Sequence, residues 1–275
     1  METLLPSQPE NYSLLIKRSF LLYRASFSKV IGFTFLFAFV LFIPQFCPDV
    51  VLATTSPFGY QAIYQIVLNL AALFIFIAIL WRMHCVIINK HEPLLEDVMM
   101  GLKKLFSVFI AAIFQSIIVL TLAIMVYGIQ MLLYQYNLLL SNNWFSIILT
   151  IVVFAGQLAV LFYVSALFIF MTPIIVIENK GVISAIERSV ALVWNHWLRT
   201  ITFQLSPWVY YFLCLFLIKF IFRINIHFSL FDQTPYTFWA SLLQMLVFTL
   251  FVPWFAAILL VQLKDLELRN KLIQS

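Results

Sequence analysis

The sequence predicts an all-α protein: a polytopic integral membrane bundle of about six transmembrane helices, forming a single membrane domain over 1–275. The first observation is composition, since 64% of the residues are hydrophobic and 10% are charged, against about 45–50% and about 25% in soluble domains. The second is that apolar residues form unbroken runs such as 30–46 and 145–171. Strands of a membrane barrel would alternate apolar and polar residues, so helices are predicted.

Each of six apolar runs is long enough to cross about 30 Å of hydrocarbon. The predicted spans are 30–53, 62–88, 105–133, 145–171, 201–222 and 239–263. Three further segments join apolar and charged residues at helical spacing, and amphipathic helices on the cytoplasmic surface are predicted at 12–28, 92–104 and 180–199. The apolar face of the last segment would also fit against the ends of the bundle, and the sequence leaves both arrangements open.

The distribution of basic residues predicts the orientation. Of the 16 lysines and arginines, all but Lys219 and Arg223 lie before the first span, around two of the connections, or in the C-terminal tail. Positive residues gather on the cytoplasmic side of a membrane. Both termini are therefore predicted to be cytoplasmic, with the connections near Thr54, Ser141 and Phe231 facing outward.

The N-terminal segment has a counterpart later in the chain. When 16–33 is placed on 186–203 without gaps, the identical pairs include Arg18 with Arg188 and Ser19 with Ser189. A weaker match places 22–24 on 102–104. The pattern predicts a surface helix followed by a two-span hairpin, used three times as pseudo-repeats. Biased composition alone would also produce such matches, and the sequence does not separate the two explanations.

One short motif resembles a known family. The pattern P-x-x-x-x-E, a small residue and A-x-x-R-S is formed by Pro173, Glu178, Gly181, Ala185, Arg188 and Ser189. It resembles the YciC-like bacterial inner-membrane proteins and the membrane domain attached to some glycerophosphoryl diester phosphodiesterases, as does the group Lys17, Arg18, Ser19, Phe20 and Tyr23 before the first span. The resemblance implies six spans in a bacterial cytoplasmic membrane. It implies no phosphodiesterase activity, which in the fused proteins belongs to a separate soluble barrel.

The predicted site residues are basic and aromatic side chains at the membrane surface. Arginine and lysine reach anionic headgroups from there, and tryptophan lies at the interface. The candidate contacts with lipid headgroups are Arg18, Lys180, Arg188, Trp194, Trp197, Arg199 and Lys219.

No catalytic, cofactor-binding or metal-binding residues are predicted. Cys47, Cys85 and Cys214 are scattered and are expected to be packing residues. The acidic residues Glu92, Glu96 and Asp97 are interpreted as the solvated start of a helix, and His84 and His91 as interface residues without enough partners for a metal. The common hydrolase and nucleotide-binding motifs are absent. Nucleic acid is not an expected partner, because no basic cluster is interleaved with aromatics.

Three functions follow, in order of preference. The first is a non-enzymatic accessory or scaffold protein of the cell envelope, with membrane lipids and another membrane protein as partners. The alternative is a carrier or channel for a lipid or other amphiphile, which needs only an apolar cavity. A weaker alternative is a membrane-bound enzyme that uses the cytoplasmic carboxylates Glu92, Asp97, Glu178 and Glu187.

Overall fold

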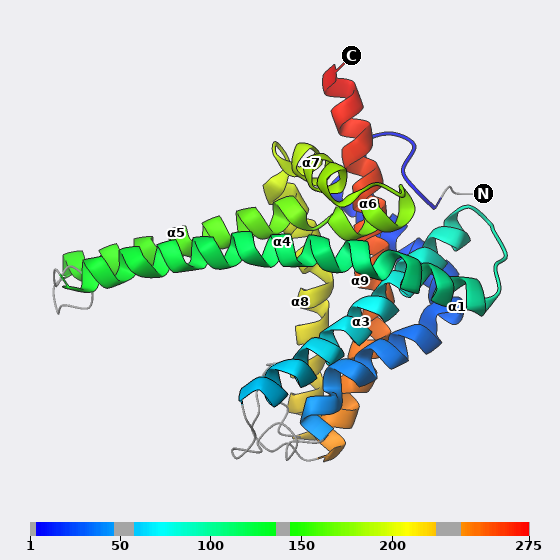
Figure 1. The fold of residues 1–275 in the computed structure, drawn as a ribbon, viewed down its shortest axis with the longest axis horizontal. Helices are drawn as coiled ribbons and strands as arrows, with labels where there is room; N and C mark the ends of the chain where they lie inside the picture. The colour runs from blue at the N-terminus through cyan, green and yellow to red at the C-terminus, as the bar shows by residue number, and fades with distance from the viewer. Residues whose placement is uncertain (1–3, 47–57, 136–143, 224–237, 275) are drawn as a thin grey trace.

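A computed structural model describes residues 4–46, 58–135, 144–223 and 238–274 (Figure 1). The described residues form only helices, which are α1 (Tyr12–Phe46), α3 (Phe58–Ile87), α4 (Leu94–Gln135), α5 (Trp144–Phe168), α6 (Met171–Ile177), α7 (Val182–Val193), α8 (Trp197–Phe222) and α9 (Phe238–Gln274). Six helical segments are long and apolar enough to cross a membrane, α5 and α6 together making one of them. The predicted fold class and the multi-pass character are thereby confirmed.

Two of the three predicted surface helices are not separate elements. Segment 12–28 is the first part of α1, and 92–104 contains the start of α4. No proline separates the charged part of either helix from its apolar part, so the backbone hydrogen bonding continues. Only the third predicted segment contains a helix of its own, α7. The end of the first predicted span, 47–53, and the connections near Thr54, Ser141 and Phe231 lie outside the described residues.

The core is built around α9, which packs against both α1 and α8. One face of α1 is buried at steps of three and four residues, and it is rich in small side chains such as Ser26, Thr34 and Ala38. Small residues let two helix backbones approach closely in a membrane. The hydroxyls of Ser26 and Thr34 donate to carbonyls of α1 itself, at 2.8 and 2.9 Å, so their burial leaves no unpaired group.

The short helix α6 is buried, although all but its first residue lie beyond the predicted span 145–171. Phe170, Ile174 and Ile175 are fully buried, and α6 contacts α3, α4 and α7. Next to it, α7 packs through Ala185 and Ser189, whose hydroxyl donates to the carbonyl of Leu167 at 2.6 Å. Of the two arrangements left open for this segment, packing against the bundle is the one that these contacts show, and contact with the membrane surface stays a prediction.

Helices α4 and α5 lie side by side and extend away from the body formed by α1, α3, α8 and α9 (Figure 1). With 42 residues, α4 is about 63 Å long, twice the hydrocarbon thickness of a bilayer. Its first part packs on α3, where a Cβ at Gly101 would lie 2.7 Å from a ring carbon of Phe74. The described N-terminal segment and the C-terminal end of α9 lie at the same end of the body (Figure 1).

Candidate functional site

A chain reversal at the end of α3 brings polar groups together. Asn89 adopts the left-handed conformation with φ of 55°, which asparagine tolerates better than most residues. The amide of Lys90 donates to the carbonyl of Cys85 at 2.9 Å, and that of Asn89 donates to Val86 at 3.3 Å. These bonds are those of a Schellman cap. The cap ends α3 and folds the next residues back over its last turns.

Glu92, two residues after the cap, is the centre of this group of side chains. Its carboxylate accepts hydrogen bonds from the indole of Trp81 at 2.8 Å and from the thiol of Cys85 at 3.4 Å, and it pairs with the ammonium of Lys90. Hydrogen bonding from Lys90 is the main cause that lowers the pKa of Glu92, against the opposing effect of burial. Glu92 is 8% exposed, so a charged carboxylate is held inside the protein.

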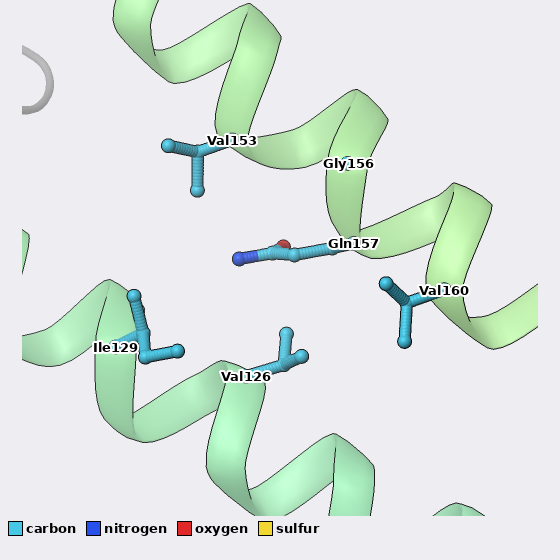
Figure 2. Close-up of a pocket in the computed structure, with 6 residues that line it drawn as sticks. All are labelled: Val126, Ile129, Val153, Gly156, Gln157 and Val160. Atoms are coloured by element: carbon cyan, nitrogen blue, oxygen red, sulfur yellow. The ribbon is translucent and has the colours of Figure 1, made fainter.

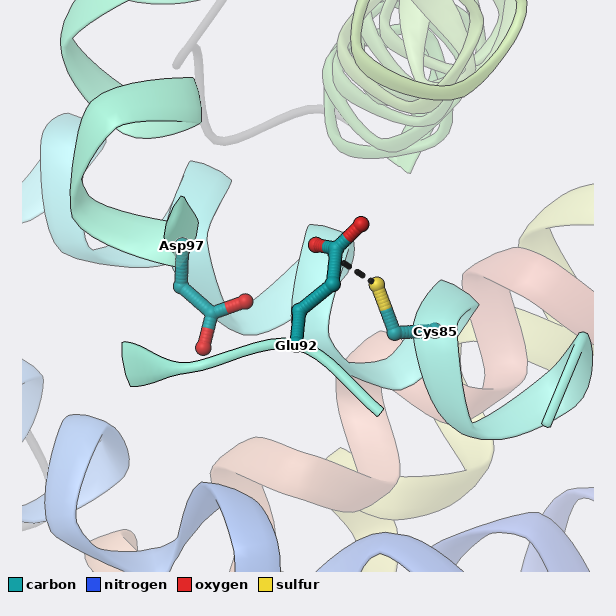
Figure 3. A group of neighbouring side chains, drawn as sticks. All are labelled: Cys85, Glu92 and Asp97. Atoms are coloured by element: carbon teal, nitrogen blue, oxygen red, sulfur yellow. Dashed lines mark hydrogen bonds between the residues drawn. The ribbon is translucent and has the colours of Figure 1, made fainter. Parts of the chain in front are cut away.

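Asp97, in the first turn of α4, points toward Glu92 (Figure 3). It is fully buried, and among the residues that the structure describes it forms an ion pair with Arg82, whose Nη1 lies 3.2 Å from Oδ2. Within the described residues neither carboxylate oxygen of Asp97 has a hydrogen-bond partner, and neither does Nε of Arg82. The thiol of Cys85 and one oxygen each of Glu92 and Asp97 lie within 4.8 Å of one another.

The interpretation of this segment as a solvated helix start is wrong for two of its three acids. Glu96 is exposed, whereas Glu92 and Asp97 are buried. The physical reason is the reversal at Asn89, which places both acids beside Trp81 and Arg82 of the preceding helix. One sequence feature could have indicated the burial of these acids. Arg82 is a charged residue inside an otherwise apolar run, and such a residue needs a buried partner of opposite charge.

A second group of charges, which we call the terminal cluster, consists of Glu10, Arg18, Arg199, Asp265 and Arg269. Arg18 pairs with the carboxylate of Glu10 at 2.6 Å. The fully buried Asp265 accepts the backbone N–H of Glu10 at 3.0 Å and Nε of Arg269 at 2.9 Å, and pairs with Arg199 at 3.3 Å. Arg199 and Arg269 also donate to the Glu10 carbonyl, at 2.6 and 2.7 Å. The cluster thus joins the N-terminal segment to α1, α8 and α9.

His196 lies beside the terminal cluster, in the turn between α7 and α8. Burial is the largest cause that lowers the pKa of its imidazole, and the positive charges of Arg269 and Arg199 add to this effect, while Asp265 opposes it. Its Nε2 has no hydrogen-bond partner among the described residues. The folded protein therefore favours the neutral form of this side chain.

The predicted headgroup contacts include several residues that are engaged within the protein. Arg188 binds Glu178, at 2.7 Å, and Glu267 of α9, while Lys180 pairs with Glu178 at 3.2 Å. Arg18 and Arg199 belong to the terminal cluster. Trp194 is 58% exposed and, with Trp197, contacts the ring of Tyr163. Lys219 is partly buried in α8. Contact of any of these residues with lipid stays a prediction.

Amide groups join helices inside the apolar segments, as expected for membrane helices. Gln204 of α8 donates to Gln262 of α9 at 2.8 Å, and Gln130 of α4 donates to Gln157 of α5 at 2.6 Å. Beside the second pair lies a hollow of about 210 Å³, bounded by Val126, Ile129, Val153, Gly156, Gln157 and Val160 (Figure 2). The Gln157 side chain extends between the two helices, and its amide nitrogen is buried without a hydrogen-bond partner in the described chain.

Comparisons with known proteins give no relative. No family model matches the chain, and neither a curated protein nor a solved structure is significantly similar to it. The resemblance to the YciC-like proteins accordingly stays a prediction.

Proposed function

We propose that the protein is a non-enzymatic scaffold or accessory subunit of a bacterial cytoplasmic membrane, with both termini in the cytoplasm, and that its α4–α5 hairpin docks against a helix of another membrane protein. The observation that carries the proposal is the unequal burial of its apolar helices. In the most apolar stretch of α9, 72% of the residues are buried, whereas in that of α4 only 11% are. The body of the protein is packed, and the hairpin has little protein around it.

Two further features of the hairpin favour a helix rather than lipid alone. A Cβ at Gly128 of α4 or Gly156 of α5 would meet no atom within 4 Å. Such open backbone surface lets a second helix approach closely, which is how small residues act in membrane interfaces. The buried amide nitrogen of Gln157 also lacks an acceptor in the described chain, and a polar group on a docking helix would supply one.

Three features bear on the other functions. The hollow between α4 and α5, about 210 Å³, is smaller than the roughly 300–1,000 Å³ of ligand pockets, which gives a carrier little support. Of the carboxylates considered for an enzyme, Glu187 is exposed and Glu178 is paired with Arg188. Glu92 and Asp97 do converge, but the thiol beside them, Cys85, is buried, and buried thiols are usually unreactive. A single lipid species retained at one per purified chain would favour the carrier instead.

The proposal is tested by photo-crosslinking in intact membranes. A photoreactive residue at Val152, which is 60% exposed on α5, is expected to give an adduct with another protein, and one at Leu36, 51% exposed on α1, is not. Gly156→Leu should abolish the adduct by blocking close approach. The matched control is Gly32→Leu, because Gly32 is also surrounded by open space but lies on α1. Adducts with lipid alone, or with a second copy of this chain, contradict a heterologous partner.

A further inference from the structure

We propose that Cys85, Glu92 and Asp97 bind one Zn²⁺ ion, which fastens the end of α3 to the start of α4. The inference is independent of the docking function. It begins with the geometry of Figure 3, in which a thiol and two carboxylates converge from both sides of the chain reversal, all three residues being buried. Sulfur and carboxylate oxygen together suit zinc, whereas Mg²⁺ and Ca²⁺ take oxygen ligands.

The distances are compatible with one ion after small side-chain rotations. Zinc bonds to sulfur at about 2.3 Å and to carboxylate oxygen at about 2.0–2.2 Å, which puts ligand atoms about 3.5 Å apart in a tetrahedron. The three ligand atoms lie within 4.8 Å of one another. Three protein ligands leave a fourth position, which water can fill.

Asp97 provides the independent sign that a ligand belongs here. A fully buried carboxylate normally receives several hydrogen bonds, because an unpaired buried charge is costly. Asp97 receives none from the described residues, and its Oδ1 lacks even the ion pair that Oδ2 makes with Arg82. It is fully buried and points toward Glu92 (Figure 3). A cation between the two carboxylates would supply the missing partner.

The charges of the site balance in both states. Without metal, Arg82 and Lys90 offset Glu92 and Asp97 while the thiol is neutral. On coordination the S–H bond of Cys85 is replaced by an S–Zn bond, and the proton leaves to solvent. The thiolate and two carboxylates then carry three negative charges, which the ion and Arg82 offset. Lys90 is free to leave Glu92 because its side chain is 57% exposed, and its departure opens the way in from water.

The test uses the full-length chain, purified in detergent and stripped with a chelator, in which Cys47 and Cys214 are replaced by serine so that Cys85 is the only thiol. Zn²⁺ is expected to bind at one ion per chain. Co²⁺ is expected to give a near-ultraviolet thiolate charge-transfer band that added Zn²⁺ removes. Asp97→Asn should weaken Zn²⁺ binding at least 10–100-fold, roughly the loss seen when even an outer-shell partner is removed.

Glu187→Gln, an exposed carboxylate on α7, is the matched control and should leave the affinity unchanged. Because the spectrum is recorded on a chain that keeps all three proposed ligands, the test does not depend on whether the ligand variants fold. The proposal is overturned by the absence of stoichiometric Zn²⁺ binding, by Co²⁺ binding without a thiolate band, or by Asp97→Asn binding Zn²⁺ as tightly as the parent chain.

Discussion

Replacing Asp265 with alanine tests the terminal cluster. The change removes the acceptor of the Glu10 N–H, at 3.0 Å, and of Nε of Arg269, at 2.9 Å, and it leaves Arg199 without its carboxylate. Breaking a buried ion pair on one side costs about 3–5 kcal/mol. The arginine side chains are 25% and 26% exposed, so water offsets part of the loss. We expect a destabilisation of about 2–4 kcal/mol.

Thermal unfolding in detergent measures this loss. At about 2–4 °C per kcal/mol, Asp265→Ala should lower the unfolding temperature by roughly 4–16 °C. Hydrogen exchange should also speed up in the N-terminal segment around Glu10, whose backbone is held by the cluster. The control, Glu187→Ala on the exposed side of α7, should change stability by less than about 0.5 kcal/mol. Equal melting of the two variants would refute the stabilising role of the cluster.

Three other perturbations probe separate parts of the account. Because the pKa of His196 is lowered from 6.5 in the folded state, stability should be constant at higher pH and fall as the pH drops below about 6.5. His196→Gln should flatten the dependence of the melting temperature on pH, and an unchanged dependence would contradict the lowered pKa of His196. Gly101→Ala places a methyl group 2.7 Å from a ring carbon of Phe74 and should destabilise the protein by about 1–3 kcal/mol. The control Gly32→Ala, with open space around it, should be neutral or stabilising. Identical melting temperatures of the two variants would argue against close packing of α3 and α4. Gln157→Leu removes the amide pair of the hairpin and should cost about 0.6–1.7 kcal/mol by thermal shift, with no loss at all counting against that bond.

The secondary structure of the spans was predictable because hydropathy and length decide it. The helix boundaries were less so. A continuous helix over 12–46 was not expected, because Arg18 and Lys29 mark the segment before the apolar run as a surface element. Charge alone does not end a helix, however; what ends α3, for example, is the cap at Asn89. The burial of α6 likewise follows from its apolar PIIVI sequence rather than from its position in a connection.

The polar clusters could not be predicted from sequence periodicity. Glu10 and Asp265 stand at opposite ends of the chain, and only the packing of α1 on α9 brings them together. Cys85, Glu92 and Asp97 are near in sequence, but their convergence depends on the cap at the end of α3. Each of these residues alone fits an ordinary packed or solvated position.

The most direct test of the account is the sidedness of the hairpin and of α7. Single cysteines at Trp144, 82% exposed at the start of α5, and at Glu187, exposed on α7, are labelled with a membrane-impermeant maleimide in spheroplasts and after lysis. A six-span protein with cytoplasmic termini predicts that position 144 reacts in intact spheroplasts and position 187 only after lysis. Position 187 reacting from outside, or position 144 shielded in both preparations because α4 and α5 lie along the membrane, would contradict it.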